Sequence, residues 1–185
     1  SINTKVYASM FAMCSYLFSS AIGQASQVIV GYLVGAGDLK STNRQVWYTC
    51  KLSMLVSLIV ATALFVLSKP IFGIFTSDPE VIRLGAVIML IEIFLEWGRS
   101  VNIVMVRCLQ AAGDIRFPVT LGILSAWTVA VLGGYLVGVV AGWGLVGIWI
   151  AMACDECLRG ALFTIRFRSG KWKETRLVAD STKGT

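Results

Sequence analysis

The 185 residues are 57% apolar and 14% charged, with a mean hydropathy of +0.78. Water-soluble globular domains carry about a quarter charged residues, so the composition excludes that class and indicates a membrane protein. The chain has no histidine, which removes Ser-His-Asp and Cys-His catalysis and histidine zinc sites from it. We therefore expect no enzyme, no cofactor and no resident metal. The net charge is +6, and the basic residues lie between apolar runs and do not form one polar face. This pattern favours membrane lipids as partners and not nucleic acid.

Five membrane-spanning helices are predicted, because a bilayer core of about 30 Å requires about 20 mainly apolar residues. The last two share one uncharged stretch, which Gly142-Trp143-Gly144 divides with a flexible turn and an interfacial aromatic side chain. The polar segment 174–185 has no apolar period and is predicted to be a disordered tail. The fold class is thus an all-α polytopic bundle, with expected spans at about 6–34, 52–75, 81–108, 117–140 and 145–166.

The distribution of basic residues predicts how the bundle lies in the membrane. Alternating the spans places most of the lysines and arginines on the side of the C-terminal tail. By the positive-inside rule that side is cytoplasmic, which we expect to be the inner face of a bacterial inner membrane. Five spans then put Ser1 outside. An external start without a signal peptide predicts further helices upstream, in a missing N-terminal part of the same protein.

Helix ends are marked by short loop motifs. Gly37-Asp38 and Gly113-Asp114 each place a glycine where a helix can end in the left-handed conformation. In both, the aspartate that follows is expected to cap the next helix. The run Thr76–Glu80 combines a capping residue, a proline and an acid, and predicts the start of the third span.

Small residues recur at four-residue spacing, which lets helix backbones approach closely in lipid. The pattern occurs at Gly31 and Gly35 and again at Gly134, Gly138 and Gly142. It is common in membrane helices, so it predicts a packed bundle and nothing narrower.

Charged residues inside the third span need a physical reason. A charge at the centre of a membrane helix costs at least about 2.5–3.5 kcal/mol. Glu92, Glu96 and Arg99 follow one another at spacings of four and three, so they share one stripe of the helix, with Asn102 on its flank. This stripe is expected to face protein or a water-filled cavity.

The fifth span repeats the pattern. Asp155, Glu156 and Arg159 lie near its middle, and either acid can reach Arg159 along the helix. Two interpretations stay open. In the first, the charges only pair with one another and lock the helices together. In the second, four carboxylates against two arginines leave a surplus of negative charge that binds a proton, a sodium ion or an organic cation.

Under the second interpretation, the candidate sites for cation and substrate coupling are Glu92, Glu96, Asn102, Asp155 and Glu156, while Arg99 and Arg159 set their charge state. Glu92 is the first choice for the coupling ion because it has no basic residue within four positions along its helix. Glu96 is the second choice.

Three sequence segments follow one another along the chain: Ser20–Asp38, then Leu95–Asn102 leading into Gln110–Pro118, then Gly144–Met152 before Asp155–Gly160. In this order they resemble the second half of multidrug and toxic compound extrusion (MATE) transporters. The resemblance implies that the five spans correspond to helices 8–12 of a twelve-helix transporter. It also implies exchange of a sodium ion or proton for a drug-like or metabolite organic cation by alternating access.

Two rival functions remain. A lipid-linked saccharide flippase of related architecture would favour basic cavity residues that hold phosphates. Among the internal charges of the third and fifth spans, however, acids outnumber arginines by four to two. A truncated product without independent transport activity would confer no efflux when expressed alone.

Overall fold

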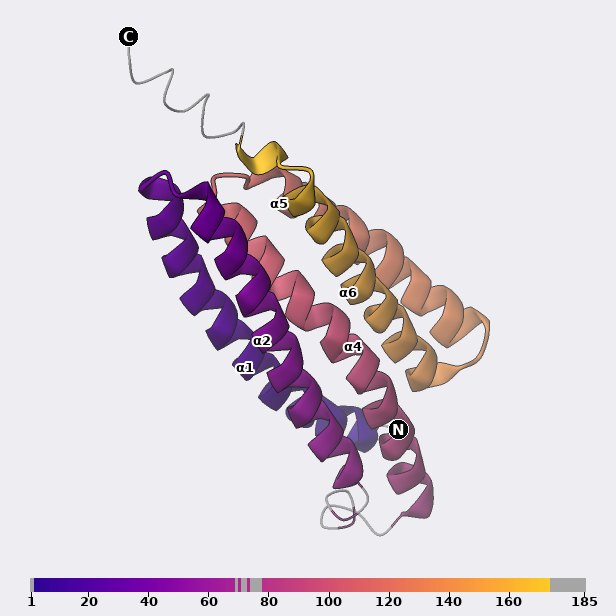
Figure 1. Cartoon of the computed structure of the whole chain (residues 1–185). Coiled ribbons are helices and arrows are strands. Elements are labelled where there is room, and N and C mark those ends of the chain that lie inside the picture. The colour runs from indigo at the N-terminus through magenta and orange to yellow at the C-terminus, as the bar shows by residue number, and fades with distance from the viewer. Residues whose placement is uncertain (1, 69, 71–72, 74–77, 174–185) are drawn as a thin grey trace.

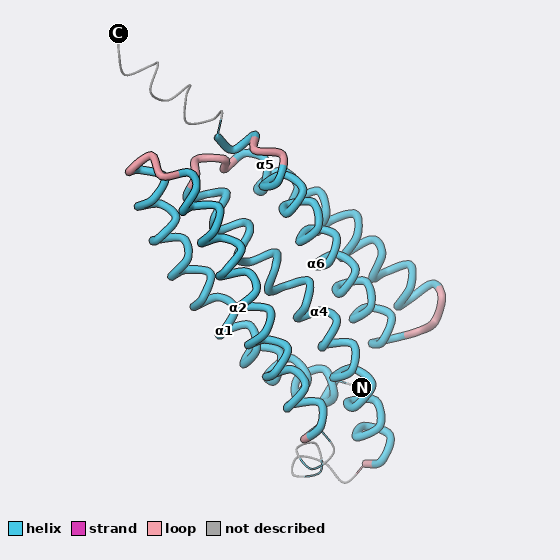
Figure 2. Tube along the Cα trace, in the orientation of Figure 1, coloured by secondary structure: helices cyan, strands magenta, loops and turns pink. Residues whose placement is uncertain are grey.

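The computed structural model describes residues 2–68, 70, 73 and 78–173. Over these residues the regular structure is helical, and Figure 2 shows helices joined by short loops with no strand. The predicted disordered tail at 174–185 and the capping residues Thr76 and Ser77 lie outside the described residues.

The predicted all-α bundle is confirmed across the described residues. The fourth predicted span is one continuous rod that begins as α5 and continues in two π-helical stretches, η1 and η2. A short 3₁₀ turn, η3, follows the last helix. The elements are α1 (Ile2–Gly35), α2 (Leu39–Val66), α4 (Pro79–Ala111), α5 (Arg116–Ser125), η1 (Ala126–Gly133), η2 (Leu136–Val140), α6 (Gly144–Arg168) and η3 (Lys171–Lys173).

Helix α2 begins at Leu39, well before the predicted span start at residue 52. Helix α2 begins earlier because residues 39–51, whose helical start is capped by Asp38, extend it beyond its apolar part. Within the described chain, three helices are long and apolar enough to cross a membrane: Ser15–Gly35, Leu39–Val66 and Arg116–Val140. The remaining two long helices, α4 and α6, are the ones that carry the internal charges.

The helices run antiparallel in chain order, and α4 packs against α1, α2 and α6 (Figure 1). The α5–η2 rod packs mainly on α6. The α1–α2 turn, the α4–α5 turn and the C-terminal end of α6 all lie at one end of the bundle. We call this the basic end, because Lys40, Arg44, Arg116, Arg166, Arg168, Lys171 and Lys173 lie there.

Both glycine corners at the basic end have the predicted left-handed backbone, with φ of 82° at Gly37 and 91° at Gly113. Asp38 caps α2 as expected, because its Oδ1 accepts a hydrogen bond from the Ser41 backbone N–H at 2.9 Å. Hydrogen bonds from Ser41 also lower the pKa of the Asp38 carboxyl.

Asp114 does not cap the next helix, so this prediction was wrong. Helix α5 begins without a side-chain cap. Asp114 is instead buried and accepts a hydrogen bond from Arg166 Nε at 2.7 Å. The Arg166 guanidinium also stacks over the Phe117 ring, 4.8 Å from its centroid. The Asp114 carboxylate binds the Arg166 guanidinium because a charged donor forms a stronger hydrogen bond than a backbone N–H. The Asp114–Arg166 pair therefore connects the end of α6 to the α4–α5 corner.

The start of α4 follows the prediction where the structure describes it. Asp78 Oδ1 accepts a hydrogen bond from the Glu80 backbone N–H at 2.9 Å, and Pro79 is the first helical residue. Proline lacks the N–H that would have no partner there, which suits it to this position.

Some of these small residues lie at close helix contacts in the described chain and some do not. A Cβ at Gly31 or Gly35 would meet nothing within 4 Å. Gly138 does pack closely, against Ile148 of α6. The tightest crossing joins α4 and α6, where a Cβ on Gly98 would lie 2.6 Å from the Cys157 backbone nitrogen. Gly160 lies against the Gly98 carbonyl oxygen at the same crossing.

Two apolar clusters fill the bundle interior. The first, nearer the basic end, contains Val46, Leu109 and Phe163 among its members. The second, nearer the opposite end, contains Ile88, Leu95 and Trp149. The residues of the two charged stripes, Glu92 to Arg99 in α4 and Asp155 to Arg159 in α6, lie near the middle of their helices. Apolar packing on either side therefore holds these charges away from both ends of the bundle.

Candidate functional site

The charged stripe of α4 forms one paired unit. Arg99 Nη1 donates to Glu92 Oε1 at 3.1 Å and also to Glu96 Oε1. The side chains of Glu92 and Glu96 are 3% and 0% exposed. Helical side chains point toward the N-terminus, so an arginine reaches back over the acids that precede it. This confirms the predicted pairing of Glu96 with Arg99.

Glu92 also has a cationic partner, which corrects the argument that made it the first choice. Arg99 lies seven positions beyond Glu92, outside the four considered from the sequence. Two helical turns keep both residues on the same stripe, and the long arginine side chain spans that distance. Glu92 therefore remains a candidate because of its position beside a cavity, described below, and not because it lacks a cation.

The charged stripe of α6 is built in the same way. Arg159 Nη2 donates to Asp155 Oδ2 at 2.6 Å and to Glu156 Oε1 at 3.1 Å. Both pairings were predicted and both are confirmed. Asp155 is buried, while the Glu156 side chain is 17% exposed.

Contacts between α4 and α6 join the two stripes into one network. Asn102 Nδ2 donates to Glu156 Oε2 at 2.5 Å, and Arg99 Nε lies 4.0 Å from Glu156 Oε1. The helices approach closely enough for this because Gly98 and Gly160 form their crossing. The structure thus brings together all seven residues that the sequence predicts for the site, and we call them the acid network: Glu92, Glu96, Arg99, Asn102, Asp155, Glu156 and Arg159.

Two further side chains bind the acid network and were missed by the sequence analysis. Trp149 Nε1 donates to Glu92 Oε2 at 2.8 Å, and Ser125 Oγ donates to Asp155 Oδ1. Trp149 lies seven residues before Glu156 and so shares its helix face, a signal that could have identified it. Ser125 lies in a long uncharged stretch whose register the sequence does not reveal.

Within the described residues, two buried atoms of the acid network have no hydrogen-bond partner: Glu96 Oε2 and Arg159 Nε. An unsatisfied buried polar group costs about 1–3 kcal/mol, and more when it carries a charge. The pairing of the charges is therefore incomplete.

A cavity of about 370 Å³ opens beside one part of the acid network. Glu92, Arg99 and Glu156 line it, together with Trp149. Helix α1 also lines the cavity, with Ser9, Met13 and Tyr16, none of which the sequence analysis had considered. Glu96 and Asp155 do not line the cavity.

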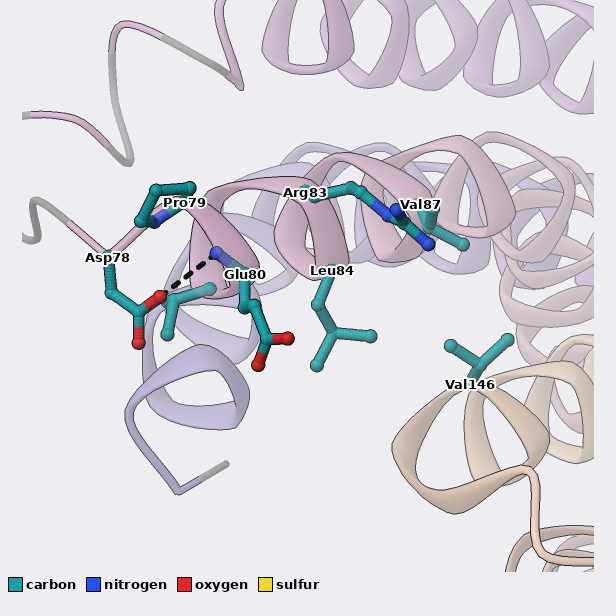
Figure 3. A pocket seen from close by; sticks show the side chains of 8 residues that line it. Asp78, Pro79, Glu80, Arg83, Leu84, Val87 and Val146 are labelled. Atoms are coloured by element: carbon teal, nitrogen blue, oxygen red, sulfur yellow. Dashed lines mark hydrogen bonds between the residues drawn. The ribbon is translucent and has the colours of Figure 1, made fainter.

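A larger cavity of about 690 Å³ lies at the opposite end of the bundle, between the first turns of α4 and α6 (Figure 3). Asp78, Glu80 and Arg83 line it from α4 and its cap, and Val146 faces them from α6. These charged side chains are exposed, so their charges carry no burial cost that would call for a function. The acid network, where that cost is high, is the better candidate site.

Apolar membrane helices around a paired but incompletely neutralised polar interior define a polytopic membrane protein of transporter type. Comparison with known families agrees with this class. The chain belongs to the MatE family, whose model matches residues 4–136, as the three sequence segments indicated.

The chain is similar to several curated transporters. It is 36% identical over 175 residues to the uncharacterized transporter YisQ of Bacillus subtilis, covering 92% of this chain and 38% of that protein. It is 28% identical over 167 residues to the probable multidrug resistance protein NorM of Thermotoga maritima, covering 89% and 35%. A NorM of Xanthomonas axonopodis is 26% identical over 167 residues, covering 90% and 36%.

The chain therefore spans less than two fifths of the length of these relatives. The comparison with solved structures found no significant match.

Proposed function

We propose that this chain is the C-terminal lobe of an ion-driven exporter that exchanges a proton or sodium ion for drug-like or metabolite organic cations by alternating access. The MatE family and the relatives named as multidrug resistance proteins support this proposal. The chain would act together with an N-terminal lobe of the same protein, since it spans only part of its relatives.

One observation carries the proposal: the acid network holds four carboxylates against two guanidiniums and opens on a cavity. If all four carboxylates were ionised, two negative charges would lack a balancing arginine. Leaving an uncompensated charge in a low-dielectric interior is strongly unfavourable. The surplus is therefore neutralised by something that reaches the site from solution, namely a proton, a sodium ion or an organic cation.

The geometry suggests a division of roles among the acids. Glu92 and Glu156 line the cavity and are the groups that an entering cation would meet. Glu96 lies behind them, fully buried, and one of its oxygens has no partner among the described residues. We assign Glu92 and Glu96 to the coupling ion, and Glu156 with Asn102 to the entering cation.

Asp155 and the two arginines would set the charge balance. Arg99 binds both acids of α4, and Arg159 binds both acids of α6, so each guanidinium is shared. A shared cation stabilises an acid less when its other acid is also ionised, which couples the charge states of the two. Binding of a cation at one acid would thereby release a proton or sodium ion from another.

The same arrangement disfavours a flippase for lipid-linked saccharides. That function needs cationic groups free to bind phosphate, whereas Arg99 and Arg159 are each engaged by two carboxylates. The gathering of basic residues at one end of the bundle favours a bacterial inner-membrane protein with the C-terminus in the cytoplasm.

The test is energy-dependent efflux of ethidium from cells that lack their own exporters and express the full-length protein. We expect Glu92→Gln and Glu96→Gln each to reduce the efflux rate by about tenfold or more, since each removes a charge that binds the coupling ion. Glu80→Gln, an exposed acid in the first turn of the same helix, should leave the rate unchanged. Wild-type efflux in both network variants would refute the proposal.

A further inference from the structure

An apolar groove of about 490 Å³ lies on the surface where α2, α4 and α6 meet. Each helix contributes successive turns of one face, so the groove runs along the helix axes for about two turns, or about 10 Å. The lining residues are Trp47, Cys50, Lys51 and Met54 of α2, Trp97, Gly98 and Val101 of α4, and Cys157, Gly160, Ala161 and Thr164 of α6.

The glycines of the α4–α6 crossing line the groove. Gly98 and Gly160 let the two helix backbones approach closely, so that their contact forms part of the groove wall. At the end away from the basic end, the groove is bounded by Trp97 and Met54, whose Nε1 and Sδ atoms lie 2.7 Å apart. The result is an apolar slot that is open at the surface.

Two cations lie along the groove toward the basic end. Lys51 lines the groove and is exposed. Arg168 is also exposed, and its guanidinium lies 5.7 Å from the centroid of the Trp47 ring. Lys51 follows Trp47 by one helical turn, so the two cations flank the same indole. No lining residue is acidic, and among the described residues neither cation has an acidic partner within 4.0 Å.

We propose that this groove binds a single anionic phospholipid, with its phosphate against Lys51 and Arg168 and one acyl chain in the slot above Gly98 and Gly160. Cations near the membrane surface attract anionic headgroups, and tryptophan is favoured at the headgroup level. An apolar slot directly below two unpaired cations matches the amphipathic shape of such a lipid. The proposal depends on the chain lying in a membrane and not on the transport activity.

The test is native mass spectrometry of the purified full-length protein. The protein is equilibrated with equal amounts of phosphatidylglycerol and phosphatidylcholine that have identical acyl chains. Two cations at about 1 kcal/mol each predict that the wild type retains one phosphatidylglycerol with a preference of about tenfold or more. The double variant Lys51→Gln/Arg168→Gln should lose this preference, whereas Arg83→Gln at the opposite end should keep it.

A second variant tests the apolar slot without changing any charge. Ala161 is exposed and lines the groove, so Ala161→Phe fills the slot from outside without disturbing the helix crossing. It should reduce the retained phosphatidylglycerol about tenfold, while Leu158→Phe, exposed on the same helix but outside the groove, should not.

Three results would overturn the proposal. The first is equal retention of the two lipids by the wild type. The second is an unchanged preference in the Lys51→Gln/Arg168→Gln variant. The third is full lipid retention by Ala161→Phe, which would show that the slot is covered by another part of the longer protein. Because the readout is lipid binding, all three are independent of whether the protein exports cations.

Discussion

The backbone of Cys157 lies so close to Gly98 that a Cβ on residue 98 would be 2.6 Å from the Cys157 nitrogen and 2.8 Å from its Cα. Backbone atoms cannot move aside as a flexible side chain can. This contact fixes the distance between α4 and α6, and the acid network spans the same two helices. The packing of small residues in the membrane and the geometry of the candidate site are thus one structural feature.

Substitution of Gly98 by alanine should therefore destabilise the protein. Overpacking costs about 1–3 kcal/mol, and we expect Gly98→Ala to lower the thermal unfolding midpoint by several degrees in detergent. Gly31→Ala is the matched control, since a Cβ there meets nothing within 4 Å and alanine favours the helix. Equal midpoints for Gly98→Ala and the wild type would contradict the close crossing.

Removal of Arg99 should leave Glu92 and Glu96 buried without their cation. Loss of one partner of a buried ion pair costs about 3–5 kcal/mol, so Arg99→Gln should strongly lower the free energy of unfolding. Glu96→Gln in the same molecule removes one of the orphaned charges and should restore more than half of the loss. Chemical unfolding of the two variants measures both effects, and the absence of rescue would show that repulsion between the acids is not the cause.

The Asp114–Arg166 pair is expected to stabilise the basic end. Asp114 is buried, but the Arg166 side chain is 21% exposed, which weakens the interaction through solvent screening. A double-mutant cycle with Asp114→Ala and Arg166→Ala should give a coupling free energy of about 1–2 kcal/mol. Strictly additive effects on unfolding would mean that the two side chains do not interact.

Trp149 should affect transport through its hydrogen bond to Glu92. Trp149→Phe keeps an aromatic ring but removes the N–H donor, and a hydrogen bond to a charged group contributes about 1.5–3 kcal/mol. We expect ethidium efflux to fall about tenfold. Trp127→Phe, on a side chain that is 69% exposed, should leave efflux unchanged; similar losses in both variants would argue against a specific role for Trp149.

Helix geometry made much of this structure predictable. The pairing of Glu96 with Arg99, and of Asp155 and Glu156 with Arg159, follows from spacings of three and four on one helix alone. The left-handed backbone at Gly37 and Gly113 was likewise predictable, because only one chain segment determines it. The proposed coupling roles of the seven network residues stay predictions.

The wrong prediction for Asp114 has a physical cause, which is competition between chain segments far apart in the sequence. Asp114 was expected to cap α5 but binds Arg166, which lies 52 positions away. Local patterns do not reveal which distant helix presents a partner. The sequence could place Trp149 on the face of α6 that carries Glu156, but it could not show that the indole N–H binds Glu92 of α4.

Exchange of an organic cation for a bound proton or sodium ion at the acid network is the central claim. Its most direct test is ion release when tetraphenylphosphonium binds the purified full-length protein, followed with a pH indicator in weak buffer and with radioactive sodium. Linkage predicts that the wild type releases about one proton or one sodium ion per cation bound, and that Glu92→Gln/Glu96→Gln releases neither. Binding without release of either ion, or equal release by that variant, would contradict the account.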